Sequence, residues 1–287
     1  MTFAETVLLG ALAGFTIFLG LPVGRLQLLS SRARVALAMF SVGVLVFLLV
    51  DVLSQGFSIV EHALEAFKAG KGGFGHAIWL AFLLLGGFTV GSAGLGLLER
   101  WIKPKKPAPP PMAGGATDTL SAEDQQRLLV ADGAAARSRA LQTGLMVAAA
   151  IGVHNFAEGL AIGVSARAGE IGLATVLIVG FALHNATEGF GIVGPLGNVK
   201  PSWRWLGLAG LIGGGPTFLG SIVGYNVTSE PLELVFYAVA GGAILYVIGE
   251  IWQGMRRYGH RELGLILLAC GFAAGIVTDL VVAYGGG

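Results

Sequence analysis

Two short segments of the sequence share the pattern His-Asn-x-x-Glu-Gly, and their residue types could bind a metal ion. The first segment contains His154 and Glu158, and the second contains His184 and Glu188. A separation of four residues places each histidine and its glutamate on one face of a helix, one turn apart. The two asparagines beside the histidines lie on an adjacent part of the same face; they are Asn155 and Asn185.

Two imidazoles and two carboxylates on neighbouring helices form a ligand set for a divalent ion. Zinc binds both ligand types, but imidazole also suits iron, nickel and copper, so the ligands do not name the metal. No cysteine lies near either motif, which argues against a thiolate copper(I) site or a closed structural zinc site. The alternative is two hydrogen-bonded pairs that hold helices together. The repetition of the motif favours metal binding.

The elements that carry these motifs are long apolar blocks. Of the 287 residues, 54% are hydrophobic and 12% are charged, and about 20 apolar residues suffice for a helix that crosses the bilayer. We predict an all-α integral membrane protein with eight transmembrane helices. These lie at about 4–21, 35–53, 77–98, 140–165, 171–193, 205–225, 232–252 and 263–283.

The distribution of charge predicts the orientation of the helices. If both termini are outside, in the periplasm, the cytoplasmic loops hold all of the 18 basic residues except Lys68, Lys71 and Arg167. Membrane proteins concentrate Lys and Arg in cytoplasmic loops in this way. We therefore expect a multi-pass inner-membrane protein of a bacterium. The net charge of +1 says nothing about nucleic acid, but the basic residues lie between the apolar blocks rather than in a patch, and we predict no nucleic-acid partner.

Three parts of the chain follow from this pattern: helices 1–3 over 1–102, a cytoplasmic Pro-rich linker over 103–139, and helices 4–8 with the metal site over 140–287. Within the linker we expect a short helix at 122–131. An amphipathic segment at 59–67 is expected to lie along the outer membrane surface. The start of the chain lacks the basic residues of a signal peptide, so the first block is expected to remain as a helix.

Several further residues have a predicted role. Glycines after the motifs would let the two motif helices approach closely; these are Gly159, Gly163, Gly189, Gly191 and Gly194. Pro216 predicts a kink in the sixth span. Glu250 is either a second ion-binding residue near the cytoplasmic end or an interface carboxylate. Solvation at helix ends or loops is expected for Asp51, Asp279, His62, His76 and His260, and packing for Cys270.

The paired motifs, the eight-span outline, the long third loop and Glu250 resemble the ZIP family of divalent metal transporters, in particular its bacterial branch. The resemblance is specific over 141–252. It implies that His154, Glu158 and Glu188, with His184, hold a primary ion, and that Asn155 and Asn185 face a second ion. The sequence departs from the family pattern at Gly215, where relatives have a glutamate, and at Ala157 and Thr187, which replace motif prolines. These differences affect whether a second ion can bind and whether the protein has the family's usual metal preference.

We therefore expect a transporter that imports a divalent metal by alternating access. Zn²⁺ is the first expectation, with Fe²⁺, Mn²⁺, Co²⁺, Ni²⁺ and Cd²⁺ as alternatives. We predict no catalytic residue and no organic cofactor, and the expected partners are metal ions, the lipid bilayer and, as an option, a second copy in a homodimer. Rival functions are an intramembrane metalloprotease, which normally needs His-Glu-x-x-His, and a haem-binding electron carrier with histidine axial ligands.

Overall fold

The computed structural model describes residues 1–26, 30–102, 122–169, 171–226 and 229–284, and these residues form helices, with turns between them and no strands. Within these ranges, the side chains of residues 102, 122–132, 168, 171–179, 181, 183, 282 and 283 are not described. The predicted all-α architecture is confirmed.

Seven described helical stretches are long and apolar enough to cross a membrane, judged by length and composition. The first combines α1 (Phe3–Phe15), α2 (Ile17–Gly20) and η1 (Leu21–Arg25), and the third combines α4 (Phe74–Thr89), η2 (Val90–Gly94) and α5 (Leu95–Ile102). The others lie in α3 (Ser31–Lys68), α6 (Ala122–Ala168), α8 (Trp203–Asn226), α9 (Glu230–Arg256) and α10 (Arg261–Tyr284). The predicted fifth span corresponds to α7 (Ile171–Val193), of which many side chains lie outside the described residues. After it, η3 (Gly194–Leu196) leads toward α8.

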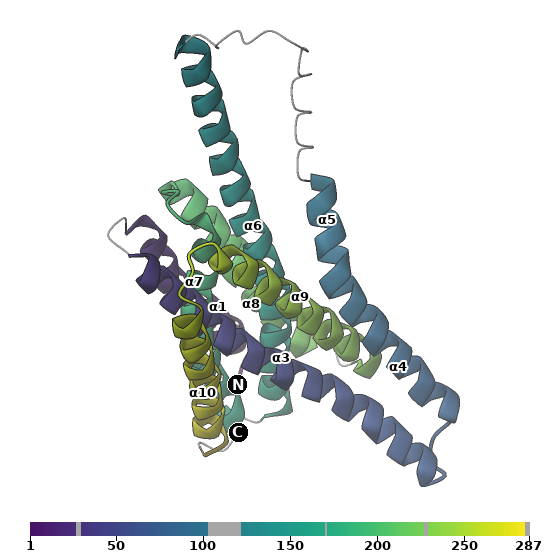
Figure 1. Cartoon of the computed structure of the whole chain (residues 1–287). Coiled ribbons are helices and arrows are strands. Elements are labelled where there is room, and N and C mark those ends of the chain that lie inside the picture. The colour runs from purple at the N-terminus through teal and green to yellow at the C-terminus, as the bar shows by residue number, and fades with distance from the viewer. Residues whose placement is uncertain (27–29, 103–121, 170, 227–228, 285–287) are drawn as a thin grey trace.

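Two helices are longer than the sequence pattern predicts. The segment at 59–67, expected to lie along the membrane surface, forms the last turns of the 38-residue helix α3. Its apolar residues Ile59, Val60 and Ala63 pack against Leu80 and Leu84 of α4, so α4 covers the face that was expected to meet lipid. The short helix expected at 122–131 is the first part of the 47-residue helix α6, which projects far beyond the other helices (Figure 1).

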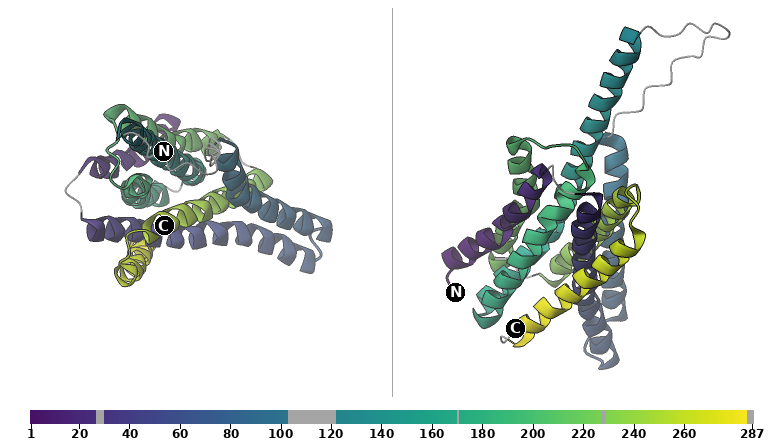
Figure 2. Two further views of the ribbon diagram at one scale, coloured as in Figure 1. Left: turned by 45° about the horizontal axis from the view of Figure 1, so that its top comes forward. Right: turned by 60° about the vertical axis from the view of Figure 1, so that its left-hand side comes forward.

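The helices fall into two groups, defined by where backbones meet (Figure 2). The first group comprises α1, α2, α6, α7 with the η3 turn that directly follows it, and α8, and the second comprises α3, α4, η2, α9 and α10. Within the first, a Cβ atom at Gly14 would overlap the carbonyl oxygen of Gly214. Within the second, a Cβ atom at Gly43 would overlap the carbonyl oxygen of Leu268. Every described glycine whose added Cβ would come within 3.0 Å of a backbone atom meets a helix of its own group.

Contacts between the groups are made through side chains. The hydroxyl of Ser41 in α3 donates to the carbonyl of Thr187 in α7, at 2.7 Å. The rings of Phe156 in α6 and Phe236 in α9 lie 4.9 Å apart, centroid to centroid. Arg257, after α9, donates to the carbonyl of Pro195 in η3, at 3.1 Å. Because side-chain contacts rearrange more easily than interlocked backbones, the boundary between the groups is the more adaptable part of the fold.

Candidate metal centre

Helices α6 and α7 present both sequence motifs to one buried region. Relative exposures are 1% for His154, 4% for Glu158, 7% for His184 and 1% for Glu188. Both asparagines, Asn155 and Asn185, are fully buried as well. Ionisable side chains at such positions in a membrane protein are costly, and they generally mark a functional site.

The two carboxylates approach the same imidazole nitrogen. Glu158 Oε1 lies 3.2 Å from His154 Nε2, as the spacing of four residues on α6 predicts. Glu188 Oε1 of α7 lies 3.9 Å from the same nitrogen. The ring of His184 meets Phe47 of α3 edge-on, with centroids 6.4 Å apart. The structure therefore brings the two motifs together across the helix pair.

The asparagines connect the motif helices to their neighbours. Asn155 Nδ2 donates to Glu188 Oε2 at 3.1 Å and to the carbonyl of Gly213 in α8 at 2.9 Å. Asn185 Nδ2 donates to the carbonyl of Ala13 at 3.0 Å, close to the point where α1 gives way to α2. Each amide nitrogen is thus used in holding helices together, and each Oδ1 atom has no hydrogen-bond donor among the described residues.

Several other buried polar atoms at the site also lack a hydrogen-bond partner among the described residues. They are both ring nitrogens of His154 and His184, both carboxylate oxygens of Glu158, and Oε1 of Glu188. Buried polar groups are hydrogen-bonded in the great majority of cases, so this concentration is unusual. Nitrogen and carboxylate oxygen are the atoms that a borderline divalent ion binds, and the donor chemistry therefore fits such an ion.

The geometry falls short of a ligand set. Within the part of the chain that the structure describes, no group of three or more His, Cys, Asp or Glu side chains has an arrangement that could hold a metal ion. The proximity of the motif residues is a finding, and their binding of one ion stays a prediction.

The glycines after the motifs pack differently from the expectation. Gly159 lies against the backbone of Thr217 and Gly163 against that of Ser221, both in α8. Gly189 meets Ile17 of α2. The remaining two, Gly191 and Gly194, face Ile251 of α9 and Ala38 of α3. The prediction that these glycines bring the motif helices together is therefore wrong. The physical reason is that each of these glycines faces a third helix (α2, α3, α8 or α9) rather than the other motif helix.

Helix α8 packs against α6 and α1 next to the site. It runs without interruption from Trp203 to Asn226 with Pro216 inside it, so the predicted distortion does not break the helix. Because proline lacks an N–H, the Ile212 carbonyl has no helical donor, and this carbonyl packs against Gly152 of α6. A Cβ atom at Gly215 would meet nothing within 4 Å. Thr217, which the sequence analysis did not single out, is fully buried beside Gly14 of α1.

Two carboxylates outside the motifs occupy distinct places. Glu250 is half-buried on α9, one helical turn from Tyr246. Asp51, expected at a helix end, lies inside α3 because that helix continues to Lys68. It is half-buried. In the sequence, Asp51 lies at the edge of an apolar block, and this pattern predicted a helix end at a position where α3 continues.

Comparison with known proteins gives matches that each cover about half of the chain. The family described as ZIP Zinc transporter matches residues 112–248. The zinc transporter ZupT of Clostridium perfringens is 28% identical over 150 residues, which cover 49% of this chain and 51% of that protein. A putative zinc transporter of Arabidopsis thaliana is 30% identical over 149 residues, covering 49% of this chain and 23% of that protein. The chain is therefore similar to ZIP zinc transporters over the part that carries both motifs.

The ZIP match contains both motifs, and it ends two residues before Glu250. The chain spans about half the length of the bacterial relative and about a quarter of the plant relative, with 51% and 23% covered. This similarity agrees with the resemblance drawn from the motifs, and together with the apolar helices it supports a multi-pass membrane protein.

Proposed function

We propose that this protein transports divalent transition-metal ions through the buried His/Glu site of α6 and α7, with Zn²⁺ as the first substrate. The observation that carries the proposal is the set of unsatisfied nitrogen and oxygen atoms on His154, Glu158, His184 and Glu188. The names of both relatives include zinc transport. Fe²⁺, Mn²⁺, Co²⁺, Ni²⁺ and Cd²⁺ remain alternatives because imidazole and carboxylate serve all of these ions.

The primary ion would bind between the two motif helices. One oxygen of Glu158 in α6 and one oxygen of Glu188 in α7 lie 3.2 Å and 3.9 Å from His154 Nε2. Small side-chain rotations, together with His184, would turn this cluster into ligands. Binding would require neutral imidazoles and ionised carboxylates. A carboxylate that holds a proton in the absence of metal would release it when the ion binds, which gives a hypothesis for proton-linked transport.

A second ion is a weaker part of the proposal. The amide nitrogens of Asn155 and Asn185 are engaged with neighbouring helices, and only their Oδ1 atoms are available as ligands. Gly215 offers no side chain where the resemblance expects a glutamate. One ion at the His/Glu site is therefore favoured over a pair.

The division of the helices into two groups suggests how the ion crosses the membrane. The site belongs to the first group, which includes α6, α7 and α8. Its neighbours in the second group, such as Ser41 and Phe47 of α3, touch it through side chains. Movement of the first group as a unit would expose the site to one side and then to the other. We propose import into the bacterial cytoplasm, with both termini outside.

The rival functions fit this site less well. The His154 nitrogen that would ligate a haem iron lies 3.2 Å from a carboxylate oxygen of Glu158, which would set a charge against an apolar macrocycle. A metalloprotease would need two histidines on one helix, and α6 and α7 supply one each. ZIP proteins are transporters rather than enzymes, and we propose no catalytic residue here.

The test is metal uptake into liposomes that contain the purified protein, measured for each of the six ions. Wild type should accumulate zinc, Glu188→Ala should not, and Glu230→Ala should match wild type because Glu230 is exposed at the start of α9 and belongs to neither motif. Equal uptake by wild type and Glu188→Ala would refute the site. An internal pH dye tests the proton hypothesis, and metal flux with no change of internal pH would remove it.

A further inference from the structure

A pocket of about 380 Å³ lies where α9 turns into α10, against the start of α3. Its floor is apolar and buried, and Val35, Met39 and Met255 are each at most 3% exposed. Its rim contains Trp252, Arg256, His260 and Arg261. The pocket lies within the second helix group, and none of its lining residues belongs to the motifs.

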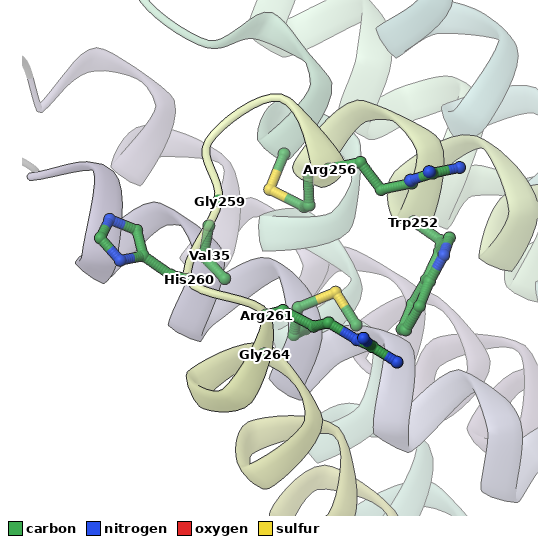
Figure 3. Close-up of a pocket in the computed structure, with 9 residues that line it drawn as sticks. Val35, Trp252, Arg256, Gly259, His260, Arg261 and Gly264 are labelled. Atoms are coloured by element: carbon green, nitrogen blue, oxygen red, sulfur yellow. The ribbon is translucent and has the colours of Figure 1, made fainter.

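The charged side chains are arranged around one side of this pocket. Figure 3 shows Arg256 and Arg261 extending to the same side of the turn, with the ring of Trp252 between them. His260 points the opposite way (Figure 3), and its Nε2 lies 3.1 Å from the Ser31 hydroxyl. In the described part of the chain neither arginine forms a salt bridge with a carboxylate.

The backbone of the turn is held in an uncommon conformation. Gly259 and His260 have φ values of 69° and 55°, and the second is unfavourable for a residue with a side chain. The Ser31–His260 contact ties this turn to α3. Helix α10 begins directly afterwards at Arg261, and the first amides of a helix favour an anion. The turn thus joins two guanidinium groups and a helix N-terminus beside an apolar cavity.

We propose that this pocket binds an anionic phospholipid. The phosphate group would lie between Arg256 and Arg261, and an acyl chain would fill the apolar floor. The combination of cationic rim and apolar floor fits an amphiphile better than a free phosphate, which would leave the floor unused. Trp252 is 38% exposed, and tryptophan is enriched at the level of the headgroups. Basic pockets between membrane helices on the cytoplasmic side bind lipid headgroups, and this end of the bundle is the expected cytoplasmic end.

The proposal is tested by native mass spectrometry of the full chain in detergent, titrated with phosphatidylglycerol or with phosphatidylcholine of the same acyl chains. Wild type should bind phosphatidylglycerol at one site and bind phosphatidylcholine far more weakly. Arg256→Gln/Arg261→Gln should weaken phosphatidylglycerol binding roughly 30-fold, because each basic residue contributes to attraction of an anionic lipid. A matched control is Arg100→Gln/Arg204→Gln, which removes the same charge from two exposed positions outside the pocket.

Any of the following results would overturn the proposal. Equal binding of the two lipids would show that the headgroup charge is not recognised. Unchanged binding in Arg256→Gln/Arg261→Gln, or an equal loss in the control, would show that the lipid binds elsewhere or through overall charge. Competition by millimolar inorganic phosphate, with phosphate itself retained by the protein, would identify a free-anion site instead. Since both arginines are exposed, the variants should fold, and a thermal unfolding scan checks this.

Discussion

Asn155 of α6 donates a hydrogen bond to Glu188 of α7 across 3.1 Å, and its amide nitrogen also reaches the Gly213 carbonyl of α8. One side chain therefore links the three helices that surround the candidate metal site. It also holds one carboxylate oxygen of Glu188, which leaves the other facing His154 at 3.9 Å. The position of a proposed ligand thus depends on a residue that is itself fully buried.

Replacing Asn155 should destabilise the protein. Asn155→Ala would remove both hydrogen bonds and leave buried acceptors without a donor, which costs about 1–3 kcal/mol for each unpaired group. Asn226→Ala is the matched control, because Asn226 is exposed and donates only to Ile222 on its own helix. Its effect should be within about 0.5 kcal/mol. Thermal unfolding in detergent measures both, and equal stability of the two variants would contradict the linking role of Asn155.

Zinc should stabilise the folded protein through Glu158. Both oxygens of Glu158 lack a described hydrogen-bond partner, so Glu158→Gln breaks no hydrogen bond seen in the structure and should not lower stability without metal. Zinc at 100 times its dissociation constant should stabilise wild type by about 2.7 kcal/mol. This gain should vanish in Glu158→Gln and persist in Glu230→Gln, as read from melting temperatures with and without zinc. A full zinc response in Glu158→Gln would remove this residue from the site.

The packing of α6 on α8 predicts opposite effects for two glycine substitutions. A Cβ atom at Gly159 would overlap the Thr217 carbonyl, whereas one at Gly207 would meet nothing within 4 Å. Gly159→Ala should therefore cost about 1–3 kcal/mol through overpacking. Gly207→Ala should stabilise by about 0.4–1 kcal/mol because it restricts the unfolded chain. Unfolding in detergent measures the difference, and a stabilising Gly159→Ala would show that the two helices do not pack as described.

A disulfide between the two helix groups should stop transport. A Cβ atom at Gly194 of η3 would lie 3.3 Å from the Cβ of Ala38 in α3, close to the range that disulfides span. In a Cys270→Ser background, Ala38→Cys/Gly194→Cys should lose zinc uptake on oxidation and regain it with reductant. Ala66→Cys/Gly72→Cys has the same 3.3 Å separation next to one end of α3 alone and should transport in both states. Continued uptake by the first variant, once mass spectrometry confirms its disulfide, would exclude movement at that boundary.

The predicted orientation can be tested by labelling. In the Cys270→Ser background, a cysteine at Lys71 should react with a membrane-impermeant maleimide in intact cells, because the loop after α3 is expected outside. A cysteine at Lys200 should react only after the membrane is permeabilised. Both positions are exposed, so accessibility to the reagent differs only by side of the membrane. The reverse pattern of labelling would invert the topology and the proposed direction of flux.

Periodicity and hydropathy predicted the motif faces correctly because they depend on local geometry. His154 and Glu158 meet along one helix, as four-residue spacing requires. Hydropathy could not locate the end of α3, since the helical hydrogen bonds continue past Asp51 wherever another helix covers the apolar face. It therefore placed Asp51 at a helix end, whereas this residue lies inside α3. Likewise, a glycine such as Gly159 indicates that another helix packs closely at that position, but only the tertiary structure shows that this helix is α8.

The length of α6 has a mechanical consequence. A helix of 47 residues extends roughly 70 Å at about 1.5 Å per residue, more than twice the thickness of the hydrocarbon core. The same rigid rod that carries His154 and Glu158 therefore protrudes well away from the bilayer. If the first helix group tilts, the N-terminal end of α6 moves through a larger distance than the metal site does. Any movement of the site within this helix is therefore also a movement of its N-terminal end.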